Sequence, residues 1–335
     1  MTDRMIKNKR GQVSLGAATI PPNGFSLKTG DILLKLWVSF GIPLAAMALF
    51  LLLWSAGAAR VQTSLGTLPG PKAVFAQAGT LWQEHWEEKG KEKEFYLKQQ
   101  QQNAEKLGRE PGYQIKVRKY TGKSTYVDQI ITSLFTVFTG FVIASLIAIP
   151  IGILCGLNRI IMIALNPFIQ IFKPVSPLAW LPLVTMIVSA VYTTQNGGVE
   201  KCFIISAITV SLCSLWPTLI NTAQGVSSMD KDIINVSRVL NLGWFSHVFK
   251  IVLPSSLPLI FTGLRISLGV GWMVLIASEM LAQNPGLGKF VWDEFQNGSS
   301  NSLARIMVAV LTIGVLGFIL DRLMVLLQKT VNFQK

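Results

Sequence analysis

Long apolar runs, separated by short polar segments, recur along most of this chain. They lie at residues 36–59, 129–158, 174–199, 202–229, 256–282 and 303–327. The first four contain no charged residue, and the last two contain only a few. Because a membrane-crossing helix needs about 20 mostly apolar residues, the pattern predicts an all-α integral membrane protein with six transmembrane helices.

The polar segments set the expected organisation of the chain. We expect a cytoplasmic N-terminal tail at 1–35, the first transmembrane helix at 36–59, an extracytoplasmic loop at 60–128, a five-helix membrane core at 129–327 with a cytoplasmic loop at 223–256, and a cytoplasmic C-terminal tail at 328–335. The apolar stretch at 160–172 is too short to span a membrane. Asn166-Pro167 inside this stretch predicts a bent cytoplasmic elbow.

Composition supports a membrane protein and gives its orientation. Of 335 residues, 50% are hydrophobic and 14% are charged, with a net charge of +13. Such a composition excludes intrinsic disorder and departs from the roughly 25% of charged residues in soluble domains. With both termini inside, the short cytoplasmic segments hold fourteen Lys and Arg residues and the short outside loops hold three. Since positive charge gathers on the cytoplasmic side, we expect cytoplasmic termini, an inner-membrane location and no nucleic-acid partner.

The loop at 60–128 is the only sizeable hydrophilic segment. Its turn at 68–71, Leu-Pro-Gly-Pro, re-aims the chain, and residues 79–107 have a helical pattern. Tyr113, Ile115 and Val117 alternate with polar residues, as in a short strand. Two interpretations stay open: a solvated cap, or a docking surface for an extracytoplasmic partner.

The residue types that perform covalent chemistry are sparse. His85 and His247 lie on opposite sides of the membrane in this topology, which excludes a metal site or a triad that uses both. Cys155, Cys202 and Cys213 fall within or beside apolar runs, where cysteine behaves as a small apolar residue. We therefore expect no catalytic residue, no metal site and no cofactor bound by this chain.

The cytoplasmic loop before the fifth run is amphipathic. Asp230 is a good N-cap for a first short helix, and Asn241-Leu242-Gly243 supplies residues that end one. A second short helix at 244–252 is expected to end at Leu253-Pro254. The loop has too few basic residues for a DNA-binding helix-turn-helix. A helical elbow that fits a groove on a cytoplasmic partner is the favoured interpretation.

The same loop resembles the EAA loop of ABC-importer permeases. Asn235-Val236-Ser237, Asn241 and Ile251-x-Leu253-Pro254 keep the spacing of that motif, although Asn-Val-Ser replaces Glu-Ala-Ala and Asn241 replaces Gly. The resemblance implies that the loop couples the protein to an ATPase. The residues expected to do so are Asn235, Val236, Ser237, Leu240, Asn241, Gly243, Ile251, Leu253 and Pro254.

Further stretches resemble one branch, the nitrate/bicarbonate/sulfonate permeases, and most of all nitrate-transport permeases. They lie at 68–71, 177–182, 216–222, 261–266, 277–280 and 292–293. The resemblance implies a homodimeric or pseudosymmetric pore, two cytoplasmic ATPase subunits that bind Mg-ATP, and an extracytoplasmic anion-binding protein. The cargo it implies is nitrate or nitrite, with bicarbonate, cyanate, taurine or an alkylsulfonate as alternatives. An ATP-independent secondary transporter is disfavoured because inverted repeats are absent from the sequence.

Charged residues within the spans are candidates for the anion path. Arg265, Trp272 and Glu279 are spaced seven apart and form one stripe on the fifth predicted span. Either the stripe lines the path, with Arg265 attracting the anion, or its charges pair with neighbouring helices. Lys173 is a second candidate near the cytoplasmic mouth, where it also fits a positive-inside anchor.

Overall fold

The computed structural model describes residues 37–63, 66–109, 114–115, 117–192, 199–230, 232–233, 235, 239–240, 242–299 and 301–331. The chain divides into two units, Met1–Trp54 and Ser55–Lys335. In the first, the π-helical turn η1 (Trp37–Gly41) leads into the apolar helix α2 (Ile42–Ala58), which ends in the second unit. The tail expected at 1–35 lies outside the described residues.

The second unit is almost entirely helical. It opens with an antiparallel hairpin of β1 (Gln62–Thr63) and β2 (Gly66–Thr67). The helical elements that follow are α3 (Pro71–Arg109), α4 (Tyr126–Leu157), α5 (Arg159–Phe172), α6 (Pro177–Val191), α7 (Lys201–Ser227), α9 (Trp244–His247), the π-helical turn η2 (Val248–Val252), α10 (Leu253–Ala282), α11 (Leu287–Asn297) and α12 (Ser302–Val331).

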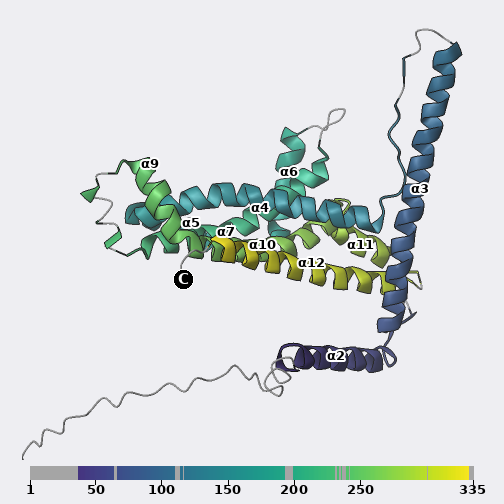
Figure 1. Ribbon diagram of the computed structural model, residues 1–335, viewed down its shortest axis with the longest axis horizontal. Helices are drawn as coiled ribbons and strands as arrows, with labels where there is room; N and C mark the ends of the chain where they lie inside the picture. The colour runs from purple at the N-terminus through teal and green to yellow at the C-terminus, as the bar shows by residue number, and fades with distance from the viewer. Residues whose placement is uncertain are drawn as a thin grey trace, which may run out of the picture. The chain divides into compact units, whose positions relative to one another are not determined.

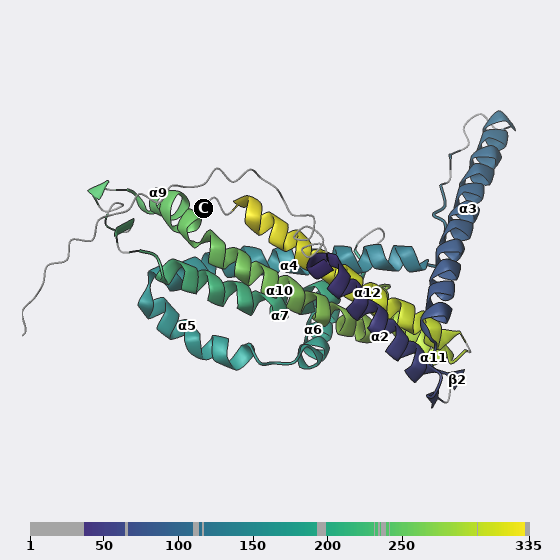
Figure 2. The same ribbon diagram turned by 60° about the horizontal axis from the view of Figure 1, so that its bottom comes forward.

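Four long helices form a bundle in this unit. Figures 1 and 2 show α4, α7, α10 and α12 running side by side, with α9 at one end of the bundle and α11 at the other. We call these the α9 end and the α11 end. Helix α3 contacts α4 and α12 at the α11 end. The bundle therefore has distinct elements at its two ends, as a protein with two aqueous faces requires.

Small residues allow the bundle helices to approach closely. On α4 they recur every four residues, at Gly140, Ala144, Ala148, Gly152 and Gly156. A Cβ on Gly152 would lie 2.6 Å from the Cβ of Thr222 and 2.8 Å from the carbonyl oxygen of Leu219, both on α7. Such stripes are the usual solution in membranes, where close packing replaces a hydrophobic driving force between helices.

The number of spans differs from the six predicted. Four described helical runs are long and apolar enough to cross a membrane, and a fifth arises if α5 and α6 count as one broken span bent by 100°. Helix α2 has only 17 residues. The all-α membrane fold is confirmed, and the count of six is not.

The break in the chain falls later than predicted. Pro167 lies inside α5, and the bend comes between Phe172 and Pro177. There Ser176 accepts a hydrogen bond from the Leu178 amide and Pro177 takes the first turn of α6. Proline at a helix start is pre-organised for it, so Pro177 begins a new helix instead of extending the old one. The single span predicted at 174–199 is thus a 15-residue helix that ends at Val191.

The loop at 60–128 also differs in detail. Its helix begins at Pro71 and not at residue 79, because proline suits the first helical position and the Val74 amide bonds the Gly70 carbonyl oxygen. Ile115 and Val117 are not in a strand, and Tyr113 lies outside the described residues. The return segment instead follows α3, where the Gln99 side chain donates to the Arg118 carbonyl oxygen at 3.2 Å. Alternation alone does not make a strand without a partner strand.

Candidate functional site

The α9 end carries an exposed apolar surface in the segment predicted to couple to an ATPase. Leu240 is 62% exposed, Phe245 71% and Phe249 64%. Asn235 is exposed as well. Exposed apolar side chains of this size are typical of a surface that binds another protein. The predicted coupling residues Val236, Ser237 and Asn241 lie outside the described residues.

The helix after this surface does not stop at Leu253-Pro254, contrary to prediction. The helical run continues from Trp244 to Ala282. The π-helical turn at Val248–Val252 makes this possible, because the Leu253 amide bonds the Val248 carbonyl oxygen five residues back. Pro254, which has no amide hydrogen, then takes the first turn of α10. One continuous helix thus joins the α9 end to the interior of the bundle.

The start of this long helix is fixed to the bundle core. Val248 and Val252 are buried together with Ile153 of α4 and Val226 of α7. Ile251 and Leu253 are partly buried, and Pro254 is exposed. Gly243 has extended backbone angles and begins α9 as its N-cap. The start of the long helix is therefore packed against α4 and α7.

Arg265 on α10 forms an ion pair with Asp321 on α12. Its Nε lies 2.5 Å from Oδ1 and its Nη2 lies 2.9 Å from Oδ2, so the pair is bidentate. Both side chains remain accessible, at 43% for Arg265 and 34% for Asp321. The sequence alone showed both charges but did not indicate that they meet.

Trp272 and Glu279 are enclosed by neighbouring helices. The Trp272 indole donates to the Ile313 carbonyl oxygen on α12 at 3.0 Å. Glu279 is completely buried and accepts hydrogen bonds of 2.9 Å from the Ser133 hydroxyl and the Gly288 amide. The carboxylate thus caps the positive end of the α11 dipole. Their role in an anion path stays a prediction.

Lys173 is exposed in the turn between α5 and α6, where it is the C-cap of α5. A cation at a helix C-terminus is favourable because the last carbonyl groups carry partial negative charge. Its position therefore suits a local anchor, and a role near the mouth of an anion path also stays a prediction. It shares no contact with the Arg265 pair in the described part of the chain.

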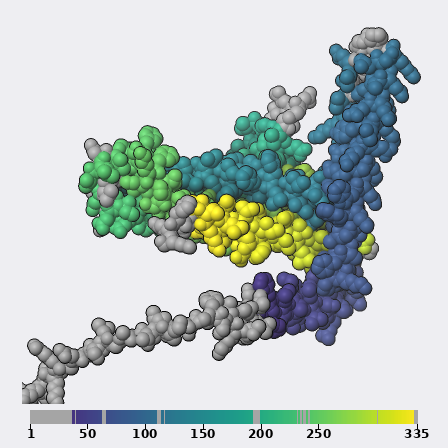
Figure 3. Space-filling model, viewed as in Figure 1, coloured from purple at the N-terminus to yellow at the C-terminus, as the bar shows by residue number. Residues whose placement is uncertain are grey.

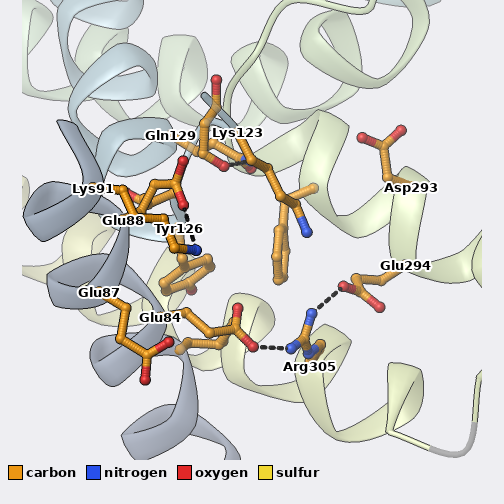
Figure 4. A pocket seen from close by; sticks show the side chains of 14 residues that line it. Glu84, Glu87, Glu88, Lys91, Lys123, Tyr126, Gln129, Asp293, Glu294 and Arg305 are labelled. Carbon is orange, nitrogen blue, oxygen red and sulfur yellow. Dashed lines mark hydrogen bonds and ion pairs between the residues drawn. The ribbon is translucent and has the colours of Figure 1, made fainter. Parts of the chain in front are cut away.

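A charged cavity of about 270 Å³ lies at the α11 end, where α3 meets α4, α11 and α12. Figure 4 shows Arg305 of α12 between Glu84 of α3 and Glu294 of α11, and it forms ion pairs with both. The Tyr120 hydroxyl donates to Glu88 at 2.7 Å, which lowers the pKa of that carboxyl group and raises the pKa of the phenol. The sequence did not predict this cavity, although the acidic residues on α3 repeat at helical spacing.

Comparisons with known proteins agree with this architecture. The family described as "Binding-protein-dependent transport system inner membrane component" matches residues 148–333. The bicarbonate transport system permease protein CmpB of Synechococcus elongatus is 35% identical over 293 residues, which are 86% of this chain and 88% of CmpB. The nitrate import permease protein NrtB of Synechocystis sp. is 36% identical over 203 residues, 61% of this chain and 69% of NrtB.

The fold also resembles a solved transporter. The inward-facing MetNI methionine ABC transporter aligns with a TM-score of 0.52 and 15% identity, over 62% of this chain and 96% of the MetNI chain. The helical bundle and its long apolar helices define a polytopic helical membrane protein. The chain belongs to the family of binding-protein-dependent transport system inner membrane components, as an importer permease of the nitrate and bicarbonate type.

Proposed function

We propose that this chain is the membrane permease subunit of an ATP-driven importer that carries nitrate or nitrite across the inner membrane. The observation that carries the proposal is the continuous helix from the exposed apolar surface at α9 to the accessible arginine of the Arg265–Asp321 pair. This helix connects a docking surface to a group that attracts anions. The relatives named as nitrate and bicarbonate permeases support the same class of cargo.

The proposed partners follow from the two ends of the bundle. Cytoplasmic ATPase subunits bind the surface that includes Leu240, Phe245 and Phe249 and hydrolyse Mg-ATP, so this chain itself is not an enzyme. An extracytoplasmic anion-binding protein delivers the cargo at the α11 end, near the charged cavity. Two copies of the chain form the pore. Both termini lie in the cytoplasm, consistent with the distribution of Lys and Arg.

Bicarbonate is the second candidate cargo, since the match to CmpB covers more of this chain than the match to NrtB does. Nitrate and bicarbonate are both trigonal, monovalent oxyanions, and one arginine fork suits either. Cyanate, taurine and alkylsulfonates remain further candidates within the same importer class.

Reconstituted vesicles test the proposal. Vesicles that contain this chain, its ATPase and its binding protein are expected to take up labelled nitrate only when Mg-ATP is supplied on the ATPase side. Parallel uptake curves for nitrite, bicarbonate, cyanate and taurine identify the preferred cargo. A catalytically inactive ATPase is the control. Uptake driven by an ion gradient with this chain alone would contradict the ATP-driven mechanism.

A further inference from the structure

The Arg265–Asp321 pair joins two long apolar helices, α10 and α12. At 1.5 Å per residue, Arg265 is about 18 Å from Leu253 at the start of α10 and about 25 Å from Ala282 at its end. Asp321 is about 28 Å from Ser302, the first residue of α12. Measured from the α11 end, both charges therefore lie toward the α9 end of a hydrocarbon core about 30 Å thick.

Both charges are nevertheless accessible at the surface of the described chain. Figure 3 shows α12 exposed along one side of the bundle, and only 11% of its most apolar window is buried. Phe318, one turn before Asp321 on the same side of α12, is an exposed apolar side chain. Charges on apolar membrane helices normally face protein or water. The pair therefore faces either another protein element or an aqueous passage.

The geometry of the pair matches the geometry of a substrate complex. Two donors on one edge of the Arg265 guanidinium reach the two oxygens of Asp321, at 2.5 and 2.9 Å. A carboxylate presents two oxygens on a planar trigonal carbon. Nitrate and bicarbonate each present the same edge, two oxygens on a planar trigonal centre. The arginine fork binds such edges in two parallel hydrogen bonds.

A second arginine makes the surroundings positive. Arg322 follows Asp321, and its guanidinium carbon lies 4.9 Å from the centre of the Phe318 ring. The cluster of Arg265, Asp321 and Arg322 thus contains two cations and one carboxylate. An anion that enters the cluster gains favourable electrostatic interactions, and it competes with Asp321 for one defined place, the Arg265 fork.

We propose that Asp321 is an internal competitor for the transported oxyanion: its carboxylate occupies the Arg265 fork until nitrate or bicarbonate displaces it. The inference rests on the proposed importer function, which requires an aqueous passage for the anion. The competitor also makes release possible, because the carboxylate returns to the fork as the anion leaves. Arg265 belongs to the continuous helix Trp244–Ala282, so movement at α9 shifts the fork relative to Asp321 on α12.

A cysteine beside the pair reports on the passage. The reporter is Phe318→Cys, three residues before Asp321 and on the same side of α12, in a chain with Cys155, Cys202 and Cys213 replaced by Ala. In the complete complex with its ATPase and binding protein, we expect an anionic sulfonatoethyl methanethiosulfonate to react about tenfold faster than its cationic trimethylammonium counterpart. Nitrate should slow that reaction. Arg265→Gln should abolish nitrate protection.

The control for exposure is Leu323→Cys, two residues after Asp321 and on the opposite side of α12. Leu323 is exposed and apolar, and at a lipid-facing position its thiol should react with neither reagent. A reporter thiol at position 318 that reacts with neither reagent would show that protein or lipid covers this surface, and would overturn the inference.

Asp321→Asn in the reporter chain tests the competition directly. Without a competing carboxylate, half-maximal protection should need at least about tenfold less nitrate. Asp321→Glu keeps the carboxylate and should protect near the original concentration. An unchanged nitrate requirement in the Asn variant would overturn the inference. If the Asn variant does not assemble, the Phe318→Cys chain with Arg265 and Asp321 intact still tests the inference. Absence of nitrate protection in that chain would also overturn the inference.

Uptake by the same vesicles separates this inference from the proposed function. If the reporter complex takes up the anion with Mg-ATP but nitrate does not protect its thiol, only the proposed role of the Arg265–Asp321 pair is contradicted. The expected labelling pattern in the reporter complex, together with no uptake of nitrate or bicarbonate by the wild-type complex, contradicts only the proposed function.

Discussion

Arg265 and Glu279 lie on one helix but have opposite surroundings. The Glu279 carboxylate is enclosed and accepts hydrogen bonds from Ser133 and Gly288. Gly286 is needed beside it, because a Cβ there would overlap the carboxylate. Arg265 remains accessible and binds a single carboxylate, that of Asp321. Enclosure with full hydrogen bonding fits a structural anchor, whereas an accessible bidentate fork fits exchange of one anion for another.

Arg265 variants are expected to lower transport in a defined order. Arg265→Lys keeps the charge but loses the planar fork, and Arg265→Gln loses both. Uptake per assembled complex should fall from wild type to Lys to Gln, with the Gln variant reduced at least about tenfold. Complex assembly, measured by co-purification, is the control. A Gln variant that assembles and transports at the wild-type rate would remove Arg265 from the mechanism.

At the scale of elements, the bundle is held together by close helix contact, and one continuous helix runs along it. The small-residue stripe on α4 holds it against α7. The π-helical turn at Val248–Val252 accommodates Pro254 without a break. The exposed surface at α9 therefore begins the same continuous helical run that carries Arg265.

Gly152→Val is expected to disturb the contact between α4 and α7. The new side chain would meet Thr222 and the Leu219 carbonyl oxygen, and overpacking of this kind costs about 1–3 kcal/mol. The yield of folded protein in detergent and its thermal midpoint should both fall. Gly314→Val on α12 is the matched control, because nothing lies within 4 Å of its Cβ position. Equal stability of the two variants would argue against close packing at Gly152.

Leu240→Asp is expected to weaken binding of the ATPase. A charge on an apolar docking surface costs a few kcal/mol when the partner covers it. Co-purification of the ATPase should be lost while membrane insertion is unchanged. Val236→Asp should act in the same way if Val236 belongs to this surface. Leu107→Asp on α3 is the control, since Leu107 is also exposed but belongs to the loop at 60–128. Normal co-purification with both coupling variants would place the ATPase contact elsewhere.

For the whole molecule, the two ends of the bundle are expected to lie on opposite sides of the membrane. In the cysteine-free chain, Leu107→Cys should react with an impermeant thiol reagent added outside intact cells. Phe245→Cys should react only after the membrane is permeabilised. Both residues are exposed, so accessibility of the side chain itself does not limit either reaction. Labelling of both positions from the same side would refute the predicted orientation.

The sequence determined the membrane class and the charges within the spans, because each depends on local composition; the coupling segment at 235–254 stays a prediction. Uninterrupted apolar runs identify helices that tolerate lipid, and the Ile251-x-Leu253-Pro254 spacing indicated the importer family. Two element boundaries were predicted wrongly. The helix continues past Pro254 and the bend falls after Phe172, because both depend on how the flanking turns pack.

Only the tertiary structure decided which charges meet. Asp321 is 56 residues from Arg265 in the chain, and Ser133 is 146 residues from Glu279. No local pattern encodes such pairs, because they arise from the contact of helices that are distant in sequence. The sequence therefore identified Arg265 as a candidate for anion binding. The packing of α10 against α12 supplied its partner, and with it the competition that we propose.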